Sequence, residues 1–353
     1  MPYDYSNNKI IKTIFPNKII TKNHQFKSVA VIGAGVVGST TAFYLAKLGF
    51  KVELFDPEVN QSIDYSKTLS GTKASLGVLM GYVSQRKSGR SWELRRRSME
   101  IWPKLISILN TIENPLKLHT PLIKLARSEH EAKQMAILAL KNKDLGLEIL
   151  KKDSPRVPKS FWPGSQYDGL ISNKDGRIEP LDLITCLMNA LDKCNVQKNN
   201  KRVAQLKRLK GDNQHRWQLS LDNKVMLEKD FIVICAAQGT ESLLSPLGHI
   251  YPIEPVIGQV LKLKIENNTF NDWSKWPAVL NSNGINLIPF KDNEILIGAT
   301  LEPGLTSNSM SLKNMKEMNG LAPEWIKSAS IQSHWQGIRI KPSNEPAPLL
   351  KNL

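Results

Sequence analysis

The chain has 353 residues, of which 41% are hydrophobic and 23% charged, a composition typical of one large globular domain or two closely joined ones. Its three cysteines lack a CxxC spacing and its six histidines lack an HxxxH pair, which argues against a disulfide framework and against a metal site. The net charge of +16 comes from mostly dispersed Lys and Arg without interleaved aromatic residues, which favours an acidic substrate or a soluble basic surface over a nucleic-acid partner.

The first 27 residues are polar and contain no signal peptide, so residues 1–27 are expected to form an N-terminal extension. The uncharged stretch 28–46 contains glycines and a Ser-Thr-Thr run, which favours a buried strand, turn and helix over a membrane span. With few cysteines and no transmembrane segment, the sequence predicts a cytoplasmic protein and leaves the oligomeric state open.

A βαβ unit is predicted next. Ser28–Ile32 has the apolar character of a buried parallel strand, and Gly33–Gly38 forms the turn and the first helical residues. Val37–Leu48 is predicted to be a helix that Gly49 ends, and Val52–Phe55 is the returning strand. Together these segments have the size of the unit that binds one half of a dinucleotide.

The glycines Gly33, Gly35 and Gly38 have the GxGxxG spacing between a strand and a helix, where the backbone can approach a pyrophosphate. Asp56 ends the second strand, where its carboxylate can accept hydrogen bonds from a ribose diol and would repel the 2′-phosphate of NADP. FAD and NAD present the same ADP half to such a site. The segment Ser70–Gly77, which offers hydroxyl and N–H groups in place of further βα units, favours FAD.

The rest of the chain changes from helices to short strands. Further helices are predicted at residues 91–109, 129–145 and 181–191. Two strands follow at 217–221 and 231–236, the second apolar enough to be buried on both faces. Alternation then predicts an antiparallel sheet from residues 259–264, 285–290 and 294–300, with a turn at 291–293. The shift predicts a second domain inserted between pieces of the first.

Several segments occur together in a specific order. They are Val29–Asp56, Lys73–Leu79, Asp175–Leu181, Ile234–Gly239, Pro255–Val260 with Ile297–Glu302, and Trp335–Arg339 with Pro346–Leu350. In this order they resemble the FAD-dependent amino-acid oxidases and dehydrogenases of the glycine oxidase and D-amino acid oxidase group.

The resemblance implies an α/β fold: a Rossmann-like FAD-binding domain with a parallel sheet, and an inserted α+β substrate domain with an antiparallel sheet. It implies a discontinuous FAD-binding domain of residues 28–113, 171–248 and 331–353. The substrate domain then comprises residues 114–170 and 249–330.

The resemblance also implies which residues contact the cofactor FAD. They are Gly33, Ala34, Gly35, Val36, Val37, Gly38, Asp56, Lys73, Ala74, Ser75, Gly77, Val203, Ala237 and Gly239. Of these, residues 73–77 belong to what resembles the family's flavin-facing loop. Gln238 departs from the family, which usually has glycine at that position of the small-residue turn. The family's pattern continues with another glycine-rich strand, turn and helix over the flavin, a segment that the resemblance implies this chain lacks after Leu353.

In the family's reaction the α-hydrogen of an amine-bearing substrate leaves as hydride to flavin N5, and water hydrolyses the resulting imine to an oxo acid and ammonia. A guanidinium is suited to hold the substrate carboxylate with two hydrogen bonds, and Arg339 is the candidate by resemblance. Tyr251 is a second candidate, for a hydrogen bond to the substrate, although a tyrosine at that position also suits a core or an interface.

The predicted function is therefore FAD-dependent oxidation of the C–N bond of a small amino acid: glycine, a D-amino acid or a related secondary amine. Two alternatives remain. A flavin oxidoreductase acting on an aminomethyl group of a tRNA base would give the basic surface a purpose, and salt-sensitive tRNA binding would identify it. The other is a catalytically inactive flavoprotein fragment.

Overall fold

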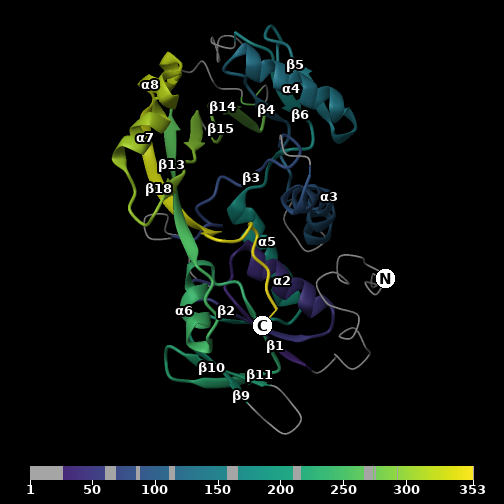
Figure 1. Ribbon diagram of the computed structural model, residues 1–353, viewed down its shortest axis with the longest axis vertical. Coiled ribbons are helices and arrows are strands. Elements are labelled where there is room, and N and C mark those ends of the chain that lie inside the picture. The colour runs from purple at the N-terminus through teal and green to yellow at the C-terminus, as the bar shows by residue number, and fades with distance from the viewer. Residues whose placement is uncertain are drawn as a thin grey trace. The chain divides into compact units, whose positions relative to one another are not determined.

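A computed structural model describes residues 27–59, 69–84, 88–110, 116–156, 166–209, 216–265, 273, 276–291 and 293–352 (Figure 1). The chain divides into two compact units. Unit 1 takes its described residues from Met1–Ser62 and Ile184–Tyr251, and unit 2 from Ile63–Leu183 and Pro252–Leu353. The predicted N-terminal extension, residues 1–27, lies outside the described residues except for Lys27.

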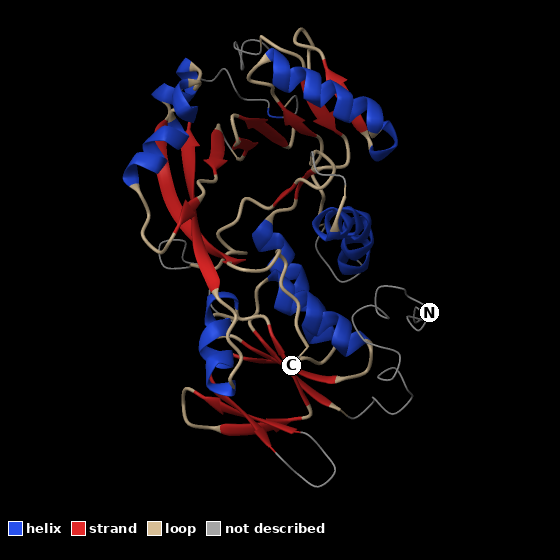
Figure 2. Cartoon of the chain, in the orientation of Figure 1, coloured by secondary structure: helices blue, strands red, loops and turns tan. Residues whose placement is uncertain are grey.

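Unit 1 contains the predicted parallel sheet. Its strands are β1 (Ser28–Ile32), β2 (Lys51–Phe55), β8 (Gln197–Asn199) and β12 (Phe231–Ile234), in the order β12-β1-β2-β8, and every pair is parallel. Figure 2 draws the strands of the chain in red. Helix α2 (Val36–Lys47) connects β1 to β2. The βαβ unit predicted from the glycine spacing and from the apolar strand is thus confirmed.

The apolar sequence of β12 predicts a strand that is buried on both faces, and this prediction is wrong. All four residues of Phe231–Ile234 are only half-buried, and the strand ends at Ile234 instead of Ala236. The reason is its place in the sheet, because β12 pairs with β1 and is the edge strand of the described part of the sheet. An apolar run alone does not distinguish a central strand from an edge strand.

The other sheet of unit 1 is antiparallel. It consists of β9 (Val203–Leu209), β10 (Arg216–Leu221) and β11 (Met226–Lys229), in the order β11-β10-β9. Leu206 and Leu219 of this sheet share a buried core with Ala30 and Phe55 of the parallel sheet. A short 3₁₀ turn (Ala237–Gly239), α6 (Thr240–Leu244) and a second 3₁₀ turn (Ser245–Leu247) follow β12.

Unit 2 contains one large sheet, in which the antiparallel strands predicted after Tyr251 join strands from the middle of the chain. Its order is β17-β13-β16-β15-β14-β4-β6-β5, with β18 paired to β13. The bounds are β4 (Leu122–Lys124), β5 (Leu147–Leu150), β6 (Gly169–Ser172), β13 (Ile253–Lys264), β14 (Val279–Ser282), β15 (Ile285–Pro289), β16 (Glu294–Gly298), β17 (Glu302–Pro303) and β18 (Ser330–Pro342). All pairs are antiparallel except β14 with β4.

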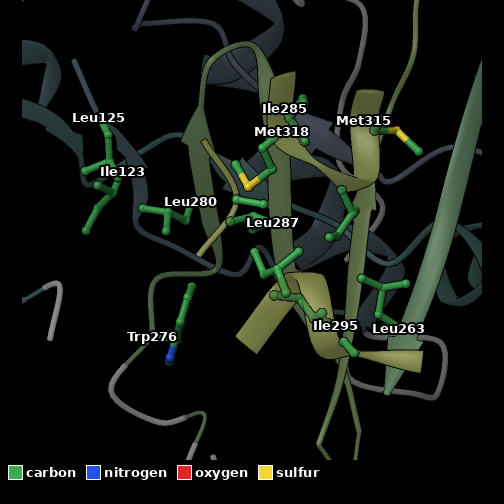
Figure 3. Close-up of a cluster of buried hydrophobic side chains, with 14 of the residues drawn as sticks. Ile123, Leu125, Leu263, Trp276, Leu280, Ile285, Leu287, Ile295, Met315 and Met318 are labelled. Atoms are coloured by element: carbon green, nitrogen blue, oxygen red, sulfur yellow. The ribbon is translucent and has the colours of Figure 1, made fainter. Parts of the chain in front are cut away.

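Side chains on the two faces of this sheet belong to two cores. Leu261 and Leu263 of β13 pack in a core with Leu287, Ile295 and Met318. Figure 3 shows Leu263 together with the last three. Val260, whose side chain leaves β13 on the opposite face, packs in the other core with residues of the loop after Ser70 and of α4. Both faces are therefore covered inside unit 2.

The remaining elements complete unit 2, and helix α5 contains its boundary with unit 1. They are β3 (Val78–Leu79), α3 (Arg90–Asn110), α4 (Glu129–Lys141), a 3₁₀ turn (Lys143–Leu145), β7 (Gly176–Arg177), α5 (Pro180–Lys193), α7 (Ser309–Lys316), a 3₁₀ turn (Met318–Gly320) and α8 (Glu324–Ser328). α4 starts where its sequence predicts, because Ser128 accepts a hydrogen bond from the N–H of Glu131. None of the helices in the described ranges combines the length and hydropathy of a membrane span.

Strand β18 has a consequence for the predicted domains. The sequence placed residues 331–353 with the FAD-binding domain, whereas β18 pairs with β13 from Ser330 to Pro342 and belongs to the large sheet of unit 2. The division into a cofactor domain and a substrate domain by function stays a prediction.

Candidate functional site

The glycine turn of unit 1 leaves no room for larger residues. Gly33 has φ +103°, and a Cβ atom built on it would stand 2.3 Å from the carbonyl oxygen of Cys235. A Cβ on Gly38 would stand 1.8 Å from the carbonyl oxygen of Gly33. Both contacts are with backbone, which cannot move without disturbing the pairing of β1 with β12 or the start of α2. The two glycines are required for packing, as the GxGxxG reading predicted.

The N-terminus of α2 has the character of an anion-binding site. Its N-cap, Gly35, has no side chain to accept a hydrogen bond, and the first turn of the helix carries no acidic residue. By helix geometry the first-turn N–H groups point out of the end of the helix, and the helix dipole adds partial positive charge there. The side chain of Val37 in this turn is 64% exposed. A diphosphate fits this end of the helix better than a protein side chain does.

Asp56, the residue after β2, holds the glycine turn. Its Oδ2 accepts a hydrogen bond from the N–H of Ala34 at 2.8 Å, and its Oδ1 accepts one from the N–H of Glu58 at 2.8 Å. The hydroxyl of Ser39 donates to the carbonyl oxygen of Ala34 at 2.9 Å. The N–H of Ala34 is therefore occupied, while each carboxylate oxygen of Asp56 keeps a lone pair for a ribose hydroxyl.

The other predicted contacts in unit 1 differ in exposure. Val203 is 6% exposed and packs in the core of unit 1, so its side chain is not available to a ligand. Ala237 is exposed and has φ +49°, a conformation that disfavours residues with a Cβ atom. Gln238 is exposed and Gly239 half-buried. The small-residue turn therefore presents its backbone at the surface of unit 1.

In unit 2, N–H groups of the loop Ser70–Gly77 donate hydrogen bonds to acceptors within the same loop. The N–H of Ala74 donates to the carbonyl oxygen of Ser70 at 3.0 Å, and that of Ser75 donates to Thr72 at 3.1 Å. The hydroxyl oxygen of Ser75 accepts from the N–H of Gly77 at 3.3 Å. These hydrogen bonds fold the loop on itself. The contacts of this loop with a cofactor stay a prediction.

This loop lies against β18, next to the candidate arginine. The N–H of Ile338 donates to the carbonyl oxygen of Leu69 at 3.0 Å, and the indole N–H of Trp335 donates to the carbonyl oxygen of Ala74 at 3.0 Å. A Cβ on Gly337 would stand 2.7 Å from the Cβ of Ala74, so a glycine is needed there for the loop to approach. Two segments that the sequence analysis identified separately thus meet inside unit 2.

Arg339 lies on the same face of β18 as Trp335 and Gly337. Its Nη2 lies 2.6 Å from the point where a Cβ on Gly258 would stand, so the guanidinium covers that glycine. The side chain is exposed, and it forms no ion pair or hydrogen bond with any residue in the described part of the chain. Tyr251, the other candidate, is half-buried and is the last residue of unit 1.

A buried carboxylate, Asp175, fixes the segment that follows the loop. Asp175 is 0% exposed and accepts hydrogen bonds from the N–H groups of Gly81 at 2.8 Å, Tyr82 at 3.0 Å and Val83 at 2.9 Å. In the sequence, Asp175 stands out only as the first residue of the resembling segment Asp175–Leu181. No local signal could have identified its role, because the partners of the carboxylate lie more than 90 residues away.

We expect Asp175→Ala to lower the free energy of unfolding by about 2–4 kcal/mol, because it leaves three buried N–H groups without an acceptor. Urea unfolding measures this, with Asp144→Ala at an exposed position as the control. An Asp175→Ala variant as stable as Asp144→Ala would contradict the expectation.

Burial raises the pKa of Asp175 although the N–H groups oppose this effect. The folded state therefore binds the proton more tightly, and the contribution of Asp175 to stability falls as pH rises through the raised pKa.

These features fit a flavin dinucleotide. The turn at Gly33 and Gly38 is a cradle that a Cβ atom would fill, the start of α2 has no side-chain cap, and Asp56 retains acceptors for a ribose. Among the described residues, no group of three His, Cys, Asp or Glu side chains is placed to hold a metal ion.

Comparison with known proteins agrees with this geometry. The family model described as "DAO: FAD dependent oxidoreductase" matches residues 28–352. The glycine oxidase of Pseudomonas putida is 26% identical over 322 residues, which cover 89% of this chain and 82% of that protein. An uncharacterised oxidoreductase of Bacillus subtilis is 23% identical over 291 residues, 78% of this chain and 72% of that protein.

Two solved structures show the same fold. The glycine oxidase from Geobacillus kaustophilus superposes with a TM-score of 0.72 at 21% identity, over 90% of this chain and 84% of that one. The iminodiacetate oxidase from Chelativorans sp. BNC1 gives a TM-score of 0.70 at 19% identity, over 89% and 84%. Since the family model spans the chain from the first parallel strand to its penultimate residue, the chain belongs to the DAO family of FAD-dependent oxidoreductases and is an enzyme that uses FAD.

Proposed function

We propose that this enzyme oxidises the C–N bond of a small amino acid, namely glycine, a D-amino acid or a related secondary amine. The observation that carries the proposal is Arg339, an exposed guanidinium without a partner in the described part of the chain, beside the loop predicted to face the flavin. The relatives support the substrate class, because their names are glycine oxidase and iminodiacetate oxidase.

In this proposal, unit 1 binds the ADP half of FAD. The N–H groups at the start of α2 bind the diphosphate, and Asp56 accepts hydrogen bonds from the ribose. When FAD is bound, its isoalloxazine ring supplies the acceptor for the hydride that leaves the substrate. The predicted flavin contacts of residues 73–77 belong to the same proposal.

The role of unit 2 is to orient the substrate. The guanidinium of Arg339 binds the substrate carboxylate through two parallel hydrogen bonds, which fixes the direction of the bond between Cα and its hydrogen. Gly258 leaves the space that the guanidinium occupies, and Trp335 holds the neighbouring loop through Ala74. No general base is assigned, since a neutral amine needs none before the hydride leaves.

The proposal is tested with the purified full chain. Its visible spectrum should show bound flavin, and glycine, D-alanine or sarcosine added without oxygen should bleach the flavin band. Methylamine, which lacks a carboxylate, is the control and should bleach it far more slowly. A colourless protein that binds no added FAD in a titration would contradict cofactor binding, and a yellow protein that none of the three amino acids bleaches would contradict the substrate class.

A further inference from the structure

A second buried carboxylate lies behind the face that carries Arg339. Glu302, at the start of β17, is 8% exposed and has no Lys, Arg or His within ion-pair distance in the described ranges. Its Oε1 accepts hydrogen bonds from the side-chain amide of Gln259 at 2.7 Å and from the hydroxyl of Thr300, and its Oε2 accepts one from the N–H of Asn308 at 2.7 Å. Burial alone would raise its pKa, but these donors, with a smaller contribution from His334, hold the pKa below its ordinary value.

The amide of Gln259 has only one orientation that satisfies its neighbours. Its Nε2 donates to Glu302 and, at 3.1 Å, to the carbonyl oxygen of Asn308, so its Oε1 faces the Nε2 of His334 at 2.9 Å. The imidazole must therefore carry a proton on Nε2. The backbone of Gln259 is tied to the same segment, because its N–H donates to the Thr300 hydroxyl at 2.9 Å and its carbonyl oxygen accepts from the Thr300 N–H at 3.2 Å.

The network reaches Arg339 through the residue next to Gln259. Successive side chains of a strand leave on opposite faces, so Gln259 faces the network while Gly258 faces Arg339. A Cβ on Gly258 would stand 3.4 Å from the carbonyl oxygen of Thr300 and 3.5 Å from the Cβ of Ala299. The same point is 2.6 Å from the Nη2 of Arg339. The Ala299–Thr300 segment therefore borders the space in which the guanidinium lies.

We infer that Glu302 is a positioning residue for substrate binding: it holds the Ala299–Thr300 segment against Gly258 and thereby fixes the guanidinium of Arg339. The inference rests on the proposed function, in which Arg339 binds the substrate carboxylate. A purely structural carboxylate would affect stability and flavin content. A positioning carboxylate affects the binding of carboxylate ligands while flavin content stays unchanged.

The first experiment uses Glu302→Gln in the holoenzyme. The amide keeps the volume but replaces one acceptor oxygen by a donor, which meets the donors of Gln259, Thr300 or Asn308. With the amino acid that reduces the wild type fastest, we expect KM to rise about tenfold while kcat changes less than about twofold, because the lost interaction orients binding. The inhibition constant of acetate, a competing carboxylate, should rise by a similar factor. Glu324→Gln, at a side chain that is 84% exposed, is the matched control.

A second pair of variants keeps the inference testable if Glu302→Gln does not fold. Thr300→Val keeps the shape but removes the hydroxyl that joins Gln259 to Glu302, and Thr300→Ser keeps the hydroxyl. We expect Thr300→Val to raise KM and the acetate constant as Glu302→Gln does, and Thr300→Ser to stay within about twofold of the wild type. Equal effects of the valine and serine variants would overturn the inference.

A double variant separates the two possible failures. If Glu302 acts through Arg339, Glu302→Gln should add less than about twofold to the KM of Arg339→Lys, because the clamp it positions is already lost. Additive effects, or an unchanged KM in Glu302→Gln, would overturn the role of Glu302 while the proposed function stands. A wild type that no amino acid reduces, or an Arg339→Lys variant with unchanged KM, would overturn the proposed function, and the role of Glu302 with it.

Discussion

Gly33→Ala is expected to yield a protein without bound FAD and to lower the free energy of unfolding by at least about 3 kcal/mol. Two effects add. The residue has φ +103°, which an L-residue with a Cβ atom disfavours by about 1–2 kcal/mol. The new Cβ would also stand 2.3 Å from the carbonyl oxygen and 2.7 Å from the carbonyl carbon of Cys235, so β1 and β12 must separate where the glycine turn begins. Flavin absorbance per chain and urea unfolding measure the two outcomes.

Gly49→Ala is the matched control for this substitution. Gly49 has φ +90°, close to that of Gly33, but a Cβ built on it would meet no atom within 4 Å. The control therefore isolates the cost of the backbone conformation, about 1–2 kcal/mol, from the cost of the steric contact. We expect Gly49→Ala to retain flavin. If Gly33→Ala retained flavin and were as stable as Gly49→Ala, the close approach of Cys235 would not be what requires glycine at this position.

The local sequence pattern is sufficient to predict the βαβ unit of unit 1. The GxGxxG spacing predicted the turn, α2 and the returning strand, because the requirement for glycine arises from atoms near in sequence or in the adjacent strand. The resemblance to the FAD-dependent amino-acid oxidases is confirmed by the family model and by the fold. The predicted role of each cofactor residue remains a prediction.

Features that depend on distant partners could not be predicted. Nothing local to Phe231–Ile234 indicates that β12 lies at the edge of the described sheet, since its apolar run would suit a central strand equally well. Likewise, nothing local to the loop Ser70–Gly77 shows that the carbonyl oxygens of Ser70 and Thr72 accept hydrogen bonds from N–H groups of the same loop. In both cases hydrogen-bond partners decided the outcome.

The candidate site illustrates the same limit. Arg339 was identified by resemblance, but its approach to Gly258 and to the loop before β3 follows from the pairing of β13 with β18, which joins residues about 80 positions apart. In the sequence, Glu302 stands out only as the last residue of the resembling segment Ile297–Glu302. The donors to its buried carboxylate lie on β13 and before α7, and no spacing rule places them near it.

Glu53 of β2 is a further case, and it leads to the second large effect. Alternation in Lys51–Phe55 suits a strand with a solvent-facing Glu53, yet Glu53 is 8% exposed and forms an ion pair with Lys229 of β11, itself 7% exposed. Lys229→Met is expected to lower the free energy of unfolding by about 3–5 kcal/mol, since the carboxylate of Glu53 would remain buried without its cation. Arg96→Met, which removes one partner of an exposed pair with Glu100, should cost less than about 0.5 kcal/mol.

The double variant Glu53→Leu with Lys229→Met tests the physical reason. If the loss in Lys229→Met comes from an uncompensated buried charge, removing that charge as well should restore most of the stability, because apolar side chains of similar volume have no desolvation penalty. Urea unfolding of the two single variants and the double variant gives the coupling between the side chains. Additive losses would show that packing of the lysine stem, and not its charge, is what Lys229 contributes. A recovery to within about 1 kcal/mol of the wild type would show that unit 1 retains its stability without this ion pair.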